Sequence, residues 1–142
     1  MSKHFFTIPL TIVPLVLFLI IAFTFSGATQ PEVWDRSFLT FHMISGGTFT
    51  LLNEHLLLFF GLVCLFFEIW KSTRQTTQEM AEQVLSMLVF VVYLVLFITV
   101  ARCAHAVFFL LMIISLIDVI GGFLVSMRTA RRSLAVEGDI SP

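Results

Sequence analysis

The stretch HAVFFLLMIISLIDVIGGFLVSM, residues 105–127, decides the fold class. It is long enough to cross a membrane, because a helix of about 20 apolar residues spans the hydrocarbon core. Its one acidic side chain, Asp118, lies near the middle. A carboxylate at that depth is costly unless it is paired or protonated, so Asp118 is the first candidate functional residue.

The composition of the whole chain is that of a membrane protein. Of 142 residues, 58% are hydrophobic and only 12% are charged. A soluble domain of this size could not bury so much apolar surface, because too much of a small fold is exposed. A membrane must therefore surround most of the chain. The formal net charge of −1 argues against nucleic acid as a partner.

We predict an all-α membrane protein with four transmembrane helices in a single domain, residues 1–142. The predicted helices cover residues 5–25, 53–70, 84–101 and 105–127. The first resembles a secretory signal, but it is longer than the apolar core of a signal peptide, so we expect it to be retained. Pro14 is expected to bend this helix. The tail, residues 133–142, is expected to be disordered.

The positions of lysine and arginine predict the orientation, because cytoplasmic loops of membrane proteins are enriched in both. With a cytoplasmic N-terminus, most of these residues fall inside: Lys3, Lys71, Arg74, Arg128, Arg131 and Arg132. Only Arg36 and Arg102 then fall outside. Both chain termini are therefore expected in the cytoplasm.

The outer loop between the first two helices is predicted to form a short β-hairpin. The segment SFLTFHMISGGTFTLL is rich in β-branched and aromatic residues, and two glycines at its centre permit a tight turn. We expect Ser37–Ile44 to pair with Thr48–Leu51 on the outer membrane surface. Since two strands alone are marginally stable, the hairpin must rest on the helices or on a partner.

Three interpretations of Asp118 remain open: helix packing, assembly with another subunit, and proton or ion handling. Tyr93 should lie level with it on the neighbouring helix, where the two could share a hydrogen bond. Small and polar residues follow one helix face around Asp118, as in membrane helix interfaces; they are Ser115, Asp118, Gly122 and Ser126. The second helix has a matching stripe of Gly61, Cys64 and Glu68.

The other polar residues have ordinary interpretations. Glu68 is expected to form an interfacial salt bridge with Lys71 or Arg128. At the outer interface, Glu54 could pair with Arg102, while His55 and His105 begin two helices at similar depth. Haem bound between these histidines, or zinc bound with His42 as well, is conceivable but has no supporting motif. No cofactor or metal is therefore expected.

The sequence contains no recognisable catalytic motif. We find no G-x-S-x-G turn, no local Cys/His pair and no glycine-rich phosphate loop. Cys64 and Cys103 are predicted at different depths, too far apart for a disulfide. The chain is thus expected to be non-enzymatic.

Four phrases together resemble a known group of proteins: FTIPLTIVPL, SGG, FFEIWKSTR and SLIDVIGGF. The group consists of small four-helix inner-membrane proteins of Gram-negative bacteria, particularly alphaproteobacteria, with no assigned function. The resemblance implies a bacterial inner membrane and supplies no substrate. We expect a scaffold or accessory subunit that binds another membrane protein or itself; the alternative is a small transporter or proton-coupled channel component that uses Asp118.

Overall fold

The computed structural model describes residues 8–25, 31–74 and 79–140. This part of the chain is mostly helical and carries one two-stranded sheet. Its elements are α1 (Ile12–Thr24), α2 (Pro31–Trp34), β1 (Ser37–His42), β2 (Thr48–Leu52), α3 (Asn53–Arg74), α4 (Glu79–Thr99), the 3₁₀ turn η1 (Ala101–Cys103) and α5 (Ala106–Ile140). Three of the helices, α3, α4 and α5, are long and apolar enough to cross a membrane.

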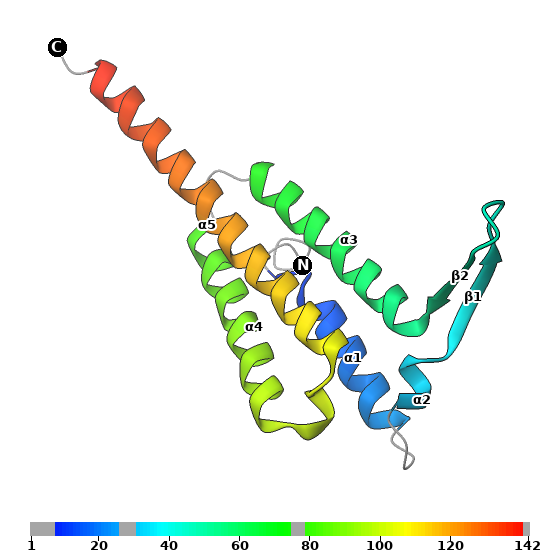
Figure 1. Ribbon diagram of the computed structural model, residues 1–142. Helices are drawn as coiled ribbons and strands as arrows, with labels where there is room; N and C mark the ends of the chain where they lie inside the picture. The colour runs from blue at the N-terminus through cyan, green and yellow to red at the C-terminus, as the bar shows by residue number, and fades with distance from the viewer. Residues whose placement is uncertain (1–7, 26–30, 75–78, 141–142) are drawn as a thin grey trace, which may run out of the picture.

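Helix α5 lies at the centre of the bundle, with α3 on one side and α4 on the other (Figure 1). Helix α1 packs against α3 and α5. The end of the bundle where α3 ends and α4 begins carries Lys71, Arg74 and Arg128, and we call it the basic end. The opposite end carries the sheet and η1, and we call it the hairpin end.

Helix α1 is shorter than the predicted first span, because its helical part begins only at Ile12 and contains 13 residues. Two prolines explain this start. Pro9 precedes the helix, and its carbonyl accepts a hydrogen bond from the N–H of Ile12 at 3.2 Å. Pro14 lies in the first turn, where backbone N–H groups have no helical partner and proline costs nothing. Pro14 therefore lies where a proline is compatible with the start of a helix, and the bend stays a prediction. Residues 5–7 of the predicted span lie outside the described part.

The other helices extend further than predicted at the basic end. Helix α3 continues through Lys71 to Arg74, and α4 begins at Glu79. Helix α5 has 35 residues and continues to Ile140, so the expectation of a disordered tail is wrong for residues 133–140. The segment ARRSLAVE is rich in good helix formers, which explains why the helix continues beyond the apolar stretch.

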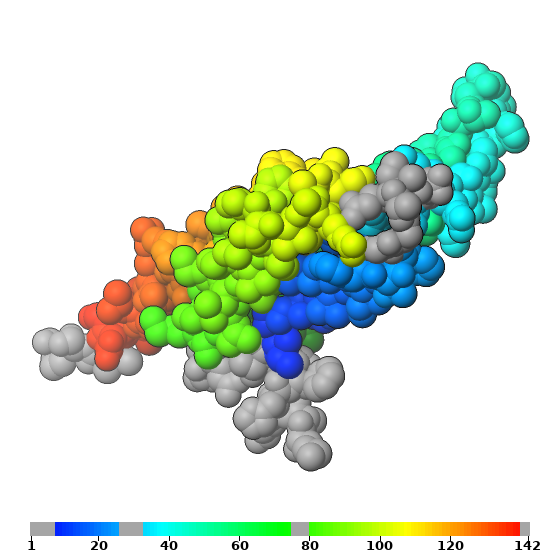
Figure 2. Space-filling model, turned by 90° about the horizontal axis from the view of Figure 1, so that it is seen from below, coloured from blue at the N-terminus to red at the C-terminus, as the bar shows by residue number. Residues whose placement is uncertain are grey.

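The hairpin is present and projects sideways from the helices (Figures 1 and 2). Strands β1 and β2 are antiparallel, and Phe41 pairs with Phe49. The N–H of Met43 donates to the carbonyl of Gly47 at 2.9 Å, and Gly46 has a φ of 83°. A three-residue loop with glycine in this left-handed conformation is a common hairpin connection. The prediction of a hairpin is confirmed, with β1 ending at His42 instead of Ile44.

An aromatic cluster forms the core between the mid-depth of the bundle and the hairpin end. Phe108 of α5 has no exposed surface, and its ring centroid lies 4.9 Å from that of Phe18 and 5.4 Å from that of Tyr93. Trp34 of α2 stacks on Phe18 at 4.9 Å. Aromatic pairs at these distances contribute packing energy beyond the area that they bury. The cluster therefore joins α1, α2, α4 and α5.

Candidate functional site: a buried carboxylate pair

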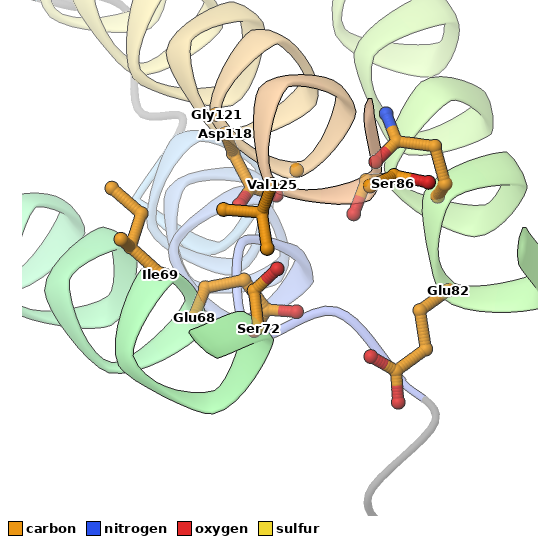
Figure 3. A pocket seen from close by; sticks show the side chains of 11 residues that line it. Glu68, Ile69, Ser72, Glu82, Ser86, Asp118, Gly121 and Val125 are labelled. Atoms are coloured by element: carbon orange, nitrogen blue, oxygen red, sulfur yellow. The ribbon is translucent and has the colours of Figure 1, made fainter. Parts of the chain in front are cut away.

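Two carboxylates from different helices line one small cavity. Asp118 of α5 is 4% exposed and Glu68 of α3 is 6% exposed. The cavity has a volume of about 30 Å³, enough space for one or two water molecules. Figure 3 shows Glu82 and Ser86 of α4 approaching it from the other side. Three helices thus enclose a polar space inside an otherwise apolar bundle.

Glu68 holds the start of α1 as well as a basic side chain. Its Oε2 atom accepts a hydrogen bond from the backbone N–H of Leu10 at 2.9 Å. Its Oε1 atom lies 3.8 Å from Nζ of Lys71, and the same ammonium lies 3.5 Å from Oε1 of Glu82. A carboxylate near the first turn of a helix satisfies an N–H group and complements the helix dipole. The predicted salt bridge of Glu68 with Lys71 is present, but Glu68 is buried instead of facing water.

Asp118 is incompletely satisfied by hydrogen bonds. The hydroxyl groups of Ser86 and Thr11 lie near its carboxylate. Its Oδ2 atom is buried and has no hydrogen-bond partner within the described residues, and the same holds for Oγ1 of Thr11 and Oγ of Ser115. Buried polar atoms normally have hydrogen-bond partners, so these three unpaired oxygen atoms are unusual. The carboxylate of Asp118 can therefore accept a proton, or a hydrogen bond from a water molecule in the cavity.

Tyr93 does not bond to Asp118, and that prediction is wrong. Its hydroxyl donates to the backbone carbonyl of Thr11 at 3.0 Å. The two side chains are nevertheless linked, because the Thr11 hydroxyl lies beside Asp118. The turn before α1 lies between α4 and α5, where the sequence predicted a direct contact of Tyr93 with Asp118. Glu68, Tyr93 and Asp118, from three helices, thus converge on Leu10 and Thr11.

The two stripes of small residues face the interior of this chain. Gly61 allows α3 to approach α5, since a Cβ there would lie 2.9 Å from Cδ2 of Leu111. Ser115 is fully buried. A Cβ on Gly122 would collide with the side chain of Gln83, whose Nε2 donates to the carbonyl of Val119 at 2.8 Å. These stripes are therefore occupied by contacts within the bundle.

The polar cavity lies toward the basic end of the bundle. Ser72 of α3, Glu82 of α4 and Ser126 of α5 line it there, and Arg128 follows two residues beyond Ser126 on α5. In the other direction, the buried aromatic side chains of Tyr93 and Phe108 fill the space. The cavity thus approaches the buried carboxylates from the basic end, and aromatic packing closes the hairpin end.

The predicted outer-interface residues lie at the hairpin end, but their pairing differs from the prediction. Oε1 of Glu54 lies 3.8 Å from Nε2 of His55. Arg102 lies over the ring of Phe23 with 5.1 Å between Cζ and the centroid, so the predicted Glu54–Arg102 pair is wrong. The ring of Phe23 on α1 offers the guanidinium a cation–π contact that the sequence did not indicate.

Both histidines at this end accept hydrogen bonds from backbone N–H groups. Nδ1 of His55 accepts from Leu52 at 3.1 Å, and Nδ1 of His105 accepts from Val107 at 3.3 Å. Each histidine therefore supports the start of its own helix. No group of three or more His, Cys, Asp or Glu side chains in the described segments is arranged to hold a metal ion.

Both cysteines are free thiols and buried. Cys103 lies in η1 at the hairpin end with no exposed surface, and burial raises the pKa of its thiol. A buried thiol whose deprotonation is disfavoured is a poor nucleophile. Neither cysteine therefore contributes a reactive group.

Several residues of the site were not predicted from the sequence. Thr11, Ser86, Gln83 and Glu82 join it only because α1 and α4 approach α5 at this level. The polar face of α4 could have indicated the contribution of this helix to the site, since Glu82, Gln83 and Ser86 follow the spacing of one helical face. The sequence alone could not place α1, because its start depends on contacts with three other helices.

Comparison of the chain with protein-family models, with curated proteins and with solved structures found no match. The site is therefore interpreted from its own chemistry.

Proposed function

We propose that the protein is a non-enzymatic membrane protein that binds and releases a proton at Asp118 and Glu68, as a small transporter or a proton-coupled component of one. One observation carries this proposal: two buried carboxylates from different helices line the same polar cavity. Ionisable groups inside a membrane are costly and commonly serve proton or ion pathways.

The balance of charge around the cavity supports proton binding. Three carboxylates, those of Glu68, Glu82 and Asp118, lie around the single ammonium of Lys71. Within the described residues, Glu68 and Glu82 form salt bridges with Lys71, whereas Asp118 forms no salt bridge. A buried carboxylate without such a partner is costly in a medium of low dielectric constant. A proton bound within the pair removes that cost.

The turn that leads into α1, with Leu10 and Thr11, is the segment best placed to respond to the proton. Its Leu10 N–H bonds to Glu68, and its Thr11 hydroxyl lies beside Asp118. A neutral carboxyl accepts hydrogen bonds more weakly than a carboxylate. Protonation should therefore loosen α1 from α3 and α5, and deprotonation should draw it back. This coupling links the charge of the pair to the position of a helix.

The test is infrared spectroscopy of the protein in lipid vesicles across a pH series. The wild type should show the carbonyl band of a protonated carboxylic acid, because a buried neutral carboxyl absorbs apart from a carboxylate. Asp118→Asn keeps the size and the acceptor of the side chain but should lose this band or one of its components. Asp35→Asn, at an exposed carboxylate near the hairpin, is the control and should leave the band unchanged. A wild-type spectrum without a protonated carboxyl at neutral pH, where exposed carboxylates are ionised, would contradict the proposal.

The accessory-subunit function remains a second candidate, and the hairpin favours it. Leu39, Phe41 and Phe49 lie on one face, because Phe41 and Phe49 are a cross-strand pair and strand residues alternate between faces. All three are exposed. Such a face can rest on another membrane protein or on the bilayer surface. Since the small-residue stripes are used within the bundle, the hairpin is the more suitable contact surface.

We also propose that the protein lies in the bacterial inner membrane with both termini in the cytoplasm. Lys71, Arg74 and Arg128 at the basic end support this orientation through the positive-inside rule. The hairpin then lies on the outer side.

A single cysteine in the turn of the hairpin tests both the orientation and the second candidate. Ser45→Cys, with Cys64 and Cys103 replaced by alanine, should react with a membrane-impermeant maleimide in spheroplasts. Ser133→Cys on the basic end of α5 should react only after permeabilisation. The reverse pattern would invert the orientation. A photoreactive maleimide on Cys at position 45 should capture one stoichiometric partner in native membranes if the hairpin binds a subunit; Phe41→Ser should abolish that capture.

A further inference from the structure

The face of the bundle formed by α1 and α3 carries two cavities, of which the larger is mainly apolar and the smaller is also lined by Arg36 and Asn53. One has a volume of about 680 Å³ and the other about 470 Å³. Both are lined by Phe60, so they adjoin at this side chain. We call the combined depression the α1–α3 groove. It is separate from the cavity at Asp118, which lies between α3, α4 and α5.

The groove follows the length of α3. Leu56 lines it near the hairpin end, and Arg74 lines it at the basic end. The helical rise between them corresponds to about 27 Å, close to the thickness of the hydrocarbon core. Val13 and Leu17, one helical turn apart on α1, form part of the opposite wall. A chain of methylene groups lying in the groove would therefore meet apolar side chains on both sides.

The basic end of the groove carries a cation and an interfacial aromatic ring. The guanidinium of Arg74 lies over the ring of Trp70, with 5.3 Å between Cζ and the centroid. Arg74 makes no salt bridge with any residue in the described ranges. Lys71 also lines this end, but its ammonium is directed to Glu68 and Glu82. Tryptophan favours the headgroup level, and arginine binds phosphate oxygens in a bidentate manner.

We propose that the α1–α3 groove binds one anionic phospholipid of the leaflet at the basic end. An acyl chain lies between α1 and α3 in the half of the groove nearer the basic end, since one leaflet is about half of the hydrocarbon core, and the phosphate lies at Arg74. The larger cavity matches this ligand, because its apolar length is followed by the cation of Arg74 at headgroup depth, whereas Arg36 and Asn53 make the smaller cavity more polar. A second apolar helix would fill the groove but would leave the guanidinium without an anion, so charge complementarity favours the lipid.

The proposal does not depend on proton binding. Lys71 lines the groove and also pairs with Glu68 and Glu82, so a substitution at Lys71 would affect both lipid binding and proton binding. Arg74 and Val63 line the groove but not the cavity at Asp118. Variants at these two positions therefore test the lipid alone.

The test is native mass spectrometry of the full chain, released from micelles that contain phosphatidylglycerol and phosphatidylcholine with identical acyl chains. The wild type should retain one phosphatidylglycerol in preference to phosphatidylcholine by about fivefold, since one basic residue near the headgroup favours an anionic lipid to this extent. Arg74→Gln should abolish the preference. Val63→Trp should fill the groove and reduce retention of both lipids severalfold.

The matched control is Arg132→Gln, which removes the same charge from the exposed end of α5. It should leave the lipid preference unchanged. Circular dichroism and elution volume establish that each variant is folded, and a second groove variant, Val13→Trp, replaces any that is not. Equal loss of preference in Arg74→Gln and Arg132→Gln would overturn the proposal, as would unchanged retention after both tryptophan substitutions. A lipid-free dimer in the wild-type spectrum would assign the groove to a second copy and overturn it as well.

Discussion

Replacing Phe108 by alanine is expected to lower the free energy of unfolding by about 3 kcal/mol. Phe108 is fully buried and its ring contacts those of Phe18, Tyr93 and Phe97. Truncation would leave a cavity where α1, α4 and α5 meet. Between membrane helices packing contacts supply much of the stability, because lipid tails are as apolar as the side chains. The measurement is equilibrium unfolding in mixed micelles with increasing sodium dodecyl sulfate, followed by circular dichroism.

The control lies on the same helix. Phe123 is 57% exposed on the surface of α5. Phe123→Ala removes the same atoms from a face that lipid or detergent can cover again, so its cost should remain below about 1 kcal/mol. Similar losses in the two variants would mean that the aromatic cluster does not hold the bundle together.

Replacing Glu68 by alanine is expected to cost about 2 kcal/mol and to release the start of α1. The variant leaves the N–H of Leu10 without its acceptor and removes one of the two carboxylates that form salt bridges with Lys71. An unpaired N–H group inside the bundle carries most of this cost. Hydrogen exchange should show faster exchange at Leu10 and in the first turn of α1, while amides in the middle of α5 remain protected.

The conservative variant separates the hydrogen bond from the charge. Glu68→Gln keeps an oxygen that can accept from Leu10 but loses the charge, so exchange at Leu10 should be faster than in the wild type and slower than in Glu68→Ala. Glu54→Ala at the hairpin end is the control for loss of a carboxylate from α3. If Glu68→Ala left exchange at Leu10 unchanged, the anchoring role of Glu68 would be wrong.

Most of the fold follows from the sequence, because apolar length is a strong signal for a membrane helix. The stretches that became α3, α4 and α5 are long enough to be identified from composition alone. The hairpin is also indicated, since its turn needs the positive φ that Gly46 supplies. The sequence gives the helix ends less well. Proline can bend a helix or begin one, and only the contacts of Pro9 and Leu10 show where α1 begins.

The candidate site is predicted only in part. Asp118 is conspicuous because it is an acid inside an apolar stretch. Glu68 looks like an ordinary interfacial residue, since Lys71 follows it by one turn. Glu68 is buried because the turn before α1 covers it. No pattern in residues 8–25 shows where that turn packs. The partner of Tyr93 is a backbone carbonyl, and a sequence carries no signal for such a contact.

The unequal lengths of the helices also bear on the membrane itself. The 13 helical residues of α1 extend about 20 Å, whereas the hydrocarbon layer is about 30 Å thick. In the proposed arrangement, in which α1 also crosses the membrane, lipids beside α1 compress or tilt to cover its ends, while those beside α4, with 21 residues, need not. Such hydrophobic mismatch costs a fraction of a kcal/mol for each Å. Bilayer thickness therefore affects the side of the molecule formed by α1 more than the side formed by α4. Thinner membranes should favour the position in which α1 packs against α3 and α5.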